Sequence, residues 1–171
     1  MRKIRVALII IWTLFFFQNS YGQKSNNVNK GKTVRQTNKL VGTWRLIEYT
    51  DLDTLTHKWT YPYGKNPRGY FTYTSTNIVN LNISTDNPLL LTEDSVKKIS
   101  ISCYNFIENY SFGYFGTYSI DWKKSIVTHH VKGGSVPWYI DTEQPRQFIL
   151  KGDTLIIGDN KKKKRVLIKA D

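Results

Sequence analysis

Residues 114–132, YFGTYSIDWKKSIVTHHVK, decide the fold of this chain. They contain two segments, 114–121 and 125–132, in which side chains of different character alternate, and a short turn separates the two segments. A period of two is typical of a β-strand that buries one of its faces. The stretch therefore predicts two consecutive strands that run in opposite directions.

Further strand-like segments lie on both sides of this stretch, at residues 42–49, 68–74, 78–83, 146–151, 154–158 and 165–169. With the first two they make eight short strands, and most are joined by short turns such as Lys151-Gly152-Asp153. Their spacing is unlike that of strand–helix–strand units, so the pattern favours an antiparallel barrel or sandwich. We therefore expect a mainly all-β fold.

One segment between the early and late strands has a helical pattern instead. Thr92 is followed by Glu93 and Asp94, as in a helix that begins with a capping residue and an acidic first turn. Apolar residues then recur at steps of three and four as far as Tyr110. We expect one helix here, which plugs or flanks one end of a barrel, with a strand over residues 99–104 as the alternative.

The N-terminus has the pattern of an export signal. A basic start is followed by the apolar run 6–17, which is too short to span a bilayer comfortably, and by the small residues Ser20 and Gly22. The pattern predicts a signal peptide over residues 1–22 and a periplasmic or secreted chain without stable membrane insertion after cleavage. An uncleaved N-terminal anchor is the competing interpretation. Residues 23–39 are polar and basic and predict a flexible leader, which leaves 40–171 for the β domain.

The charge and the cysteine count limit the classes of function. Part of the formal net charge of +12 lies in the signal peptide and the leader, and a further basic run, 161–165, is interpreted as a solvated hairpin loop. No nucleic-acid recognition motif is visible, so we expect no specific nucleic-acid binding. Cys103 is the single cysteine, which excludes an intrachain disulfide and a cysteine-based metal site.

Five motifs in chain order resemble the lipocalin-like domain family of bacteria and fungi. They are LVGTWRL at 40–46, YPYGKNPRG at 61–69, YFGTY at 114–118, VTHHV at 127–131 and TEQPRQF at 142–148. Each motif is weak alone, whereas five in the right order over most of the chain are fairly specific. The resemblance implies a calycin-type, eight-stranded antiparallel barrel with an internal cavity.

The resemblance also implies structural roles at the start of the barrel. Gly42-Thr43-Trp44 is similar to the Gly-x-Trp motif that opens the first lipocalin strand, and Trp44 then closes the barrel floor. In lipocalins a basic residue packs on this tryptophan, and either Arg165 or Lys169 is available for that position. Asp141 departs from the family pattern, because many members have a glycine there.

Strand alternation indicates which polar side chains face the interior. His129 shares a face with Val127 and Val131, opposite His130, and Arg146 shares a face with Phe148. If apolar neighbours mark the interior, both His129 and Arg146 face the cavity. Adjacent histidines on opposite faces cannot bind one metal ion together, so we expect neither a metal site nor a cofactor.

Two interpretations of these inward residues stay open. A buried guanidinium needs a partner, either the carboxylate of Glu48 within the barrel or an acidic or carbonyl group of a ligand. His129 is either a wall residue that hydrogen-bonds a neighbour, or a donor or general base in the cavity.

The leading hypothesis is an exported lipocalin-like protein that binds a small, largely hydrophobic molecule in its barrel. The expected ligand-binding residues are His129, Arg146, Phe148, Trp138, Tyr118, Tyr73 and Tyr61, with Trp44, Glu48 and Gly42 in structural roles. One alternative is an acid–base enzyme of the isomerase or cyclase type that uses His129 on a hydrophobic substrate. Another is an envelope interaction protein that uses exposed aromatic residues around Trp138 and the basic ends. The sequence does not indicate the oligomeric state.

Overall fold

The computed structural model describes residues 38–98 and 101–170. The predicted signal peptide and most of the predicted leader lie outside this part of the chain, as does the side chain of Cys103. Within it, no helix is both long enough and apolar enough to cross a membrane.

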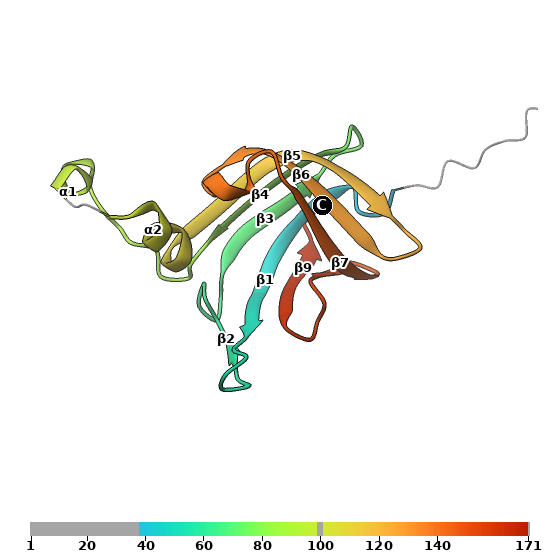
Figure 1. Ribbon diagram of the computed structural model, residues 1–171, viewed down its shortest axis with the longest axis horizontal. Helices are drawn as coiled ribbons and strands as arrows, with labels where there is room; N and C mark the ends of the chain where they lie inside the picture. Colours follow the sequence, from blue (N-terminus) through green and yellow to red (C-terminus); the bar gives the residue numbers. More distant parts are fainter. Residues whose placement is uncertain (1–37, 99–100, 171) are drawn as a thin grey trace, which may run out of the picture. The chain divides into compact units, whose positions relative to one another are not determined.

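The chain forms one antiparallel sheet that closes on itself (Figure 1). Its strands are β1 (Gly42–Leu52), β2 (Trp59–Thr60), β3 (Arg68–Tyr73), β4 (Ile78–Ser84), β5 (Ser111–Asp121), β6 (Ile126–Gly134), β7 (Glu143–Lys151), β8 (Thr154–Ile157) and β9 (Lys163–Lys169). Apart from β2, they follow each other in chain order around the barrel, and β9 pairs with β1 to close it. The two-residue β2 only extends the far end of β1, so the predicted all-β, eight-stranded barrel is confirmed.

Alternation along each strand separates the core from the surface. In β4, Val79, Leu81 and Ile83 are buried while the residues between them are exposed. The same rule buries Val127, His129 and Val131 in β6, as the pattern predicted. Burial of such aliphatic side chains contributes about 1.5–3 kcal/mol each, and the inner face of the sheet therefore holds the fold together.

One end of the barrel is closed around Trp44, whose side chain is 1% exposed. Its indole Nε1 donates a hydrogen bond to the carbonyl of Leu40 over 2.8 Å. The ammonium of Lys169 lies 4.6 Å from the indole centroid and also donates to the carbonyl of Val41. Lys169 is therefore the basic residue on the barrel-floor tryptophan, and Arg165 is not. We call this end, with Tyr118 and the β3–β4 turn, the closed end.

The expectation of one continuous helix is wrong. The structure has two short helices, α1 (Glu93–Lys98) and α2 (Cys103–Asn109). Ser102 has an extended backbone, with φ −66° and ψ 142°, and its hydroxyl accepts a hydrogen bond from the amide of Asn105. This serine starts a new helix at Cys103, which also removes the alternative of a strand through residues 103 and 104. The buried Ile107 lies in α2, and the hydroxyl of Tyr63 donates to its carbonyl.

Asp141 has a backbone conformation that explains why glycine suits this position. Its φ is 59°, in the left-handed region, where aspartate is tolerated better than most other residues that have a side chain. It follows the short 3₁₀ helix η1 (Pro137–Tyr139), and its amide donates to the carbonyl of Val131. Asp141 therefore keeps the turn geometry that a glycine would allow, although it departs from the family pattern.

Candidate functional site

A cavity of about 440 Å³ opens at the end of the barrel opposite Trp44, which we call the open end. The residues that line it come from all the strands except β2, from the 3₁₀ helix η1 and from the β8–β9 connection. Buried apolar side chains, Phe71, Leu81 and Ile157, form its deep wall. Exposed residues at its rim are Pro145, Gln147, Asp159 and Lys163.

Aromatic rings form much of the cavity wall. Tyr49 and Phe112 have ring centroids 6.4 Å apart, Phe112 and Tyr114 6.3 Å, and Tyr114 and Tyr139 5.9 Å. Apolar and aromatic walls with a few polar groups are usual in sites for small molecules. The wall therefore suits a ligand with an apolar body.

His129 lies in the wall, is 1% exposed, and bridges two tyrosines. Its Nε2 is 2.9 Å from the hydroxyl of Tyr73, and its Nδ1 is 2.7 Å from the hydroxyl of Tyr114. Burial, together with the positive charge of Arg146 and the neighbouring His130, lowers the pKa of His129 to about 3. The imidazole is therefore neutral at neutral pH, and its two ring nitrogens are one donor and one acceptor.

These contacts give no support to His129 as a proton carrier at neutral pH. A general base works best when its pKa is near the working pH and its acceptor nitrogen can reach the substrate. In His129 both nitrogens already contact tyrosine hydroxyls. Burial also raises the pKa of Tyr73 and of Tyr114, so both stay protonated.

Arg146 lines the same cavity and is half-buried. Its Nη1 donates to the carbonyl of Pro145 over 3.1 Å, its Nη2 donates to Oε1 of Gln144 over 3.0 Å, and its Cζ is 5.9 Å from the ring centroid of Tyr139. Within residues 38–98 and 101–170, it makes no ion pair with a carboxylate. Two of its five N–H groups are used, so others remain available to a bound molecule.

The interpretation in which Glu48 pairs with Arg146 inside the barrel is wrong, and a β-bulge is the reason. Glu48 instead forms an ion pair with Lys164, with Oε1 2.9 Å from Nζ. The register between β1 and β9 shifts between Leu46 and Glu48. A bulge of this kind changes which side chains face inward. After it, Tyr49 and Asp51 reach the cavity, and Glu48 no longer shares a face with Leu46.

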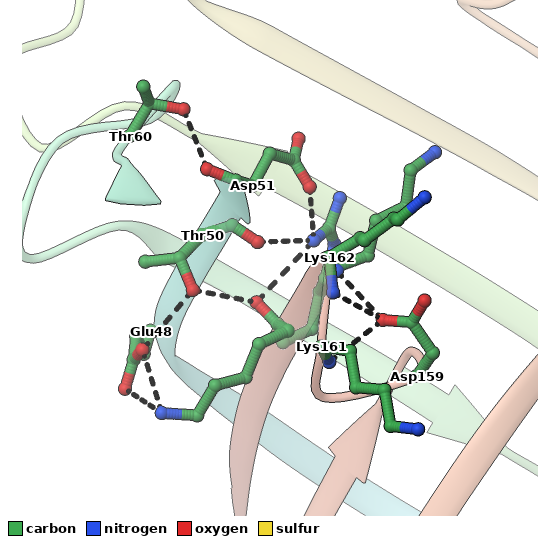
Figure 2. A network of polar contacts seen from close by, with 10 residues as sticks. Glu48, Thr50, Asp51, Thr60, Asp159, Lys161 and Lys162 are labelled. Atoms are coloured by element: carbon green, nitrogen blue, oxygen red, sulfur yellow. Dashed lines mark hydrogen bonds and ion pairs between the residues drawn. The ribbon is translucent and has the colours of Figure 1, made fainter. Parts of the chain in front are cut away.

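Arg165, in contrast, has a carboxylate partner. Its Nη1 donates to Oδ1 of Asp51 over 2.7 Å and to the carbonyl of Thr50 over 2.8 Å, and its Cζ lies 3.6 Å from the ring centroid of Tyr49. Figure 2 shows Asp51, Thr50 and Glu48 within this polar network, with Asp159 opposite them. Arg165 is a buried residue of β9, so the interpretation of the basic run 161–165 as a solvated loop is wrong at its C-terminal end.

Asp159, in the loop before β9, is held by the backbone. Its Oδ1 accepts hydrogen bonds from the amides of Lys161, Lys162 and Lys163 at 2.8–3.0 Å. These bonds lower its pKa to about 2. The carboxylate at the rim is thus already used to fix the loop.

Of the seven expected ligand-binding residues, the structure brings His129 and Arg146 together at the cavity. The other five do not line it. Phe148 packs against Trp122, and Tyr118 donates to the carbonyl of Thr74 at the closed end. The hydroxyl of Tyr73 contacts the cavity residue His129, but Tyr73 itself does not line the cavity. Tyr61 and Trp138 are 45% and 55% exposed.

Sequence reasoning missed several residues of the wall, chiefly Tyr114, Tyr139 and Tyr49. Tyr114 has a signal in the sequence, because it is separated by two alternation steps from Tyr118 and shares its buried face. Tyr139 lies in η1 and Tyr49 follows the bulge, and neither feature has a recognisable pattern. In the part of the chain that the structure describes, no group of three or more His, Cys, Asp or Glu side chains is placed to hold a metal ion.

A model of the lipocalin-like domain matches residues 41–170. The chain belongs to the lipocalin-like domain family. The match spans the barrel from the start of β1 to the end of β9, and the resemblance of the five motifs is confirmed. The family's barrel is a fold that binds small molecules. A search of curated proteins found no match.

Proposed function

We propose that this protein is exported and binds a small, largely hydrophobic molecule in the cavity of its barrel. The observation that carries the proposal is a cavity of about 440 Å³ that combines a deep apolar wall with Arg146, a cation without an ion-pair partner in the described residues. Pockets for small ligands are about 300–1,000 Å³ and have few polar groups. The basic and apolar N-terminus supports the exported location.

The location can be tested directly. We expect the mature protein, isolated from the envelope or the medium, to begin at Gln23 when its N-terminal mass is measured. A chain that keeps residues 1–22 and stays in the membrane fraction would support the uncleaved anchor instead.

Binding can be tested by titration calorimetry of the delipidated protein with decanol, a neutral and apolar probe. We expect saturable binding of one molecule. Leu81→Trp fills the deep wall of the cavity and should weaken this binding at least about tenfold, which is about 1.4 kcal/mol. Ile149→Trp makes a similar change on the exposed face of β7 and should leave binding unchanged. Absence of binding, or equal effects of the two substitutions, would contradict the cavity as the site.

A further inference from the structure

We propose that the polar head of the ligand is a carboxylate, bound by the hydroxyl of Tyr114 and the guanidinium of Arg146. In this arrangement Tyr73 and His129 are positioning residues, because they direct the Tyr114 proton into the cavity. The proposal names the ligand class, an apolar monocarboxylic acid. It rests on the proposed function, since it takes the cavity as the binding site.

The first step concerns the proton of the neutral His129 ring, which has two possible positions. If Nε2 held the proton, the hydroxyl of Tyr73 would accept it, and the proton of that hydroxyl would need a different acceptor. Tyr73 is 1% exposed and does not line the cavity, and the structure describes no second hydrogen-bond partner for it. A buried hydroxyl without an acceptor costs about 1–3 kcal/mol, so this tautomer is disfavoured.

The opposite tautomer satisfies both His129 and Tyr73. Tyr73 donates to Nε2 of His129, and the Nδ1–H of His129 donates to the hydroxyl oxygen of Tyr114. The hydrogen of the Tyr114 hydroxyl is then left for another acceptor. Because Tyr114 lines the cavity, that acceptor is a molecule in the cavity. Hydrogen bonds in such a chain polarise one another, which strengthens the last donor.

The second step places a cation near this donor. Arg146 lines the same cavity. Its Cζ and the ring centroid of Tyr114 each lie 5.9 Å from the ring centroid of Tyr139. Burial raises the pKa of the Tyr114 hydroxyl, and the positive charge of Arg146 acts on the same hydroxyl in the opposite direction, so the two groups are electrostatically coupled. A carboxylate has two oxygens, so it can accept from Arg146 and Tyr114 together in charge-assisted hydrogen bonds.

The third step excludes an amine. The carboxylates at the cavity are already engaged, Asp51 by Arg165 and Asp159 by three backbone amides. The polar groups that lie beside the Tyr139 ring, on Arg146 and Tyr114, are donors. A ligand ammonium beside the Tyr139 ring would therefore meet the like charge of Arg146, whereas an alcohol would leave Arg146 without a counter-charge.

The test compares decanoate, decanol and decylammonium by calorimetry on the purified, delipidated protein. We expect decanoate to bind at least about tenfold more tightly than decanol, and decylammonium more weakly than either. Equal binding of decanoate and decanol would overturn the carboxylate and leave the proposed function standing. Binding of none of the three would contradict the proposed function itself.

Variants then distinguish the residues that contact the carboxylate from those that only position the Tyr114 proton. Arg146→Gln and Tyr114→Phe should each reduce the preference for decanoate over decanol about tenfold, with little change for decanol. Tyr73→Phe should reduce the preference less, because it removes only the group that fixes the tautomer. Tyr118→Phe is the matched control, since the hydroxyl of Tyr118 donates to the Thr74 carbonyl at the closed end, and the preference should not change.

A nitrogen–proton correlation spectrum of the histidine rings reads the tautomer without any ligand. We expect His129 to hold its proton on Nδ1. A proton on Nε2 would overturn the positioning role of Tyr73 and His129, even if Tyr73→Phe failed to fold. An unchanged ligand preference in Tyr114→Phe would overturn the role of that hydroxyl.

Discussion

The two ends of the barrel use their polar side chains in opposite ways. At the closed end, Lys169 and Tyr118 donate to main-chain carbonyls, and Lys169 also covers the ring of Trp44. At the open end, Arg165 is matched by Asp51, but Arg146 has no carboxylate among the described residues. Both ends are built from the same strands, so the difference arises from side chains and connections.

This difference predicts that polar side chains at the closed end contribute mainly to stability, whereas those at the open end contribute mainly to ligand binding. Donors at the closed end are used within the fold, and changing them should alter the free energy of unfolding more than the affinity for a ligand. At the open end, Arg146 and Tyr114 keep N–H and O–H groups that the fold does not use, so changing these groups should have the opposite effect. The predictions below test this division, and they run from the largest expected effect to the smallest.

Trp44→Ala should give the largest loss of stability. The indole is buried, donates to the carbonyl of Leu40 and packs under Lys169, so its removal leaves a cavity and an unpaired carbonyl. We expect the free energy of unfolding to fall by about 3–5 kcal/mol in urea denaturation. Trp138→Ala removes a mostly exposed tryptophan and should change it by less than about 1 kcal/mol. Similar losses of stability in the two variants would contradict the role of Trp44 in stabilising the closed end.

His129 should make stability depend on pH. Its pKa is about 3 in the folded protein and about 6.5 in the unfolded chain, so the unfolded chain binds the proton more tightly. The free energy of unfolding therefore falls as the pH drops below about 6.5, by about 2 kcal/mol at pH 5 from this group alone. Urea denaturation from pH 7 to pH 5 should show this slope, and His129→Gln should lack it.

A matched histidine controls for the other titrating groups. His57 is exposed, so His57→Gln should keep the slope of the native protein. If His129→Gln kept the full slope as well, the neutral state of His129, and the tautomer argument built on it, would be wrong.

The two arginines of the cavity should differ in their effect on stability. Arg165→Gln breaks an ion pair with Asp51 and a bond to the carbonyl of Thr50, so we expect a loss of about 2 kcal/mol in urea denaturation. Arg146→Gln removes a cation with no ion-pair partner and should change the free energy of unfolding by less than about 0.5 kcal/mol. Equal losses would contradict the contrast between the two residues.

Strand alternation predicts the antiparallel all-β fold and the inward direction of His129 and Arg146, because the period of a strand is set by backbone geometry alone. The choice of a barrel over a sandwich comes from the resemblance of the five motifs. It does not predict depth along the barrel axis. Phe148 and Tyr118 face inward as expected, but they lie away from the cavity, against Trp122 and at the closed end. Depth depends on register and on how the barrel closes, and neither can be read from one strand.

Bulges and caps account for the other differences. The shift between Leu46 and Glu48 changes every face that follows it in β1, and no residue type marks it in the sequence. The hydroxyl of Ser102 starts α2 within an apolar helical pattern that otherwise continues. A register shift in β1 and a side-chain cap at Ser102 thus override the sequence pattern at these two places.

The pair formed by Glu48 and Lys164 should give the smallest effect, and it tests the bulge. Both side chains are about one-third exposed, so their attraction is screened by water. We expect a coupling energy of about 0.5 kcal/mol in a double-mutant cycle of Glu48→Gln and Lys164→Gln, falling towards zero in about 1 M salt. The same cycle with Arg146→Gln in place of Lys164→Gln should show no coupling. A coupling to Arg146 would mean that Glu48 faces the interior and already pairs with the cation that we assign to the ligand.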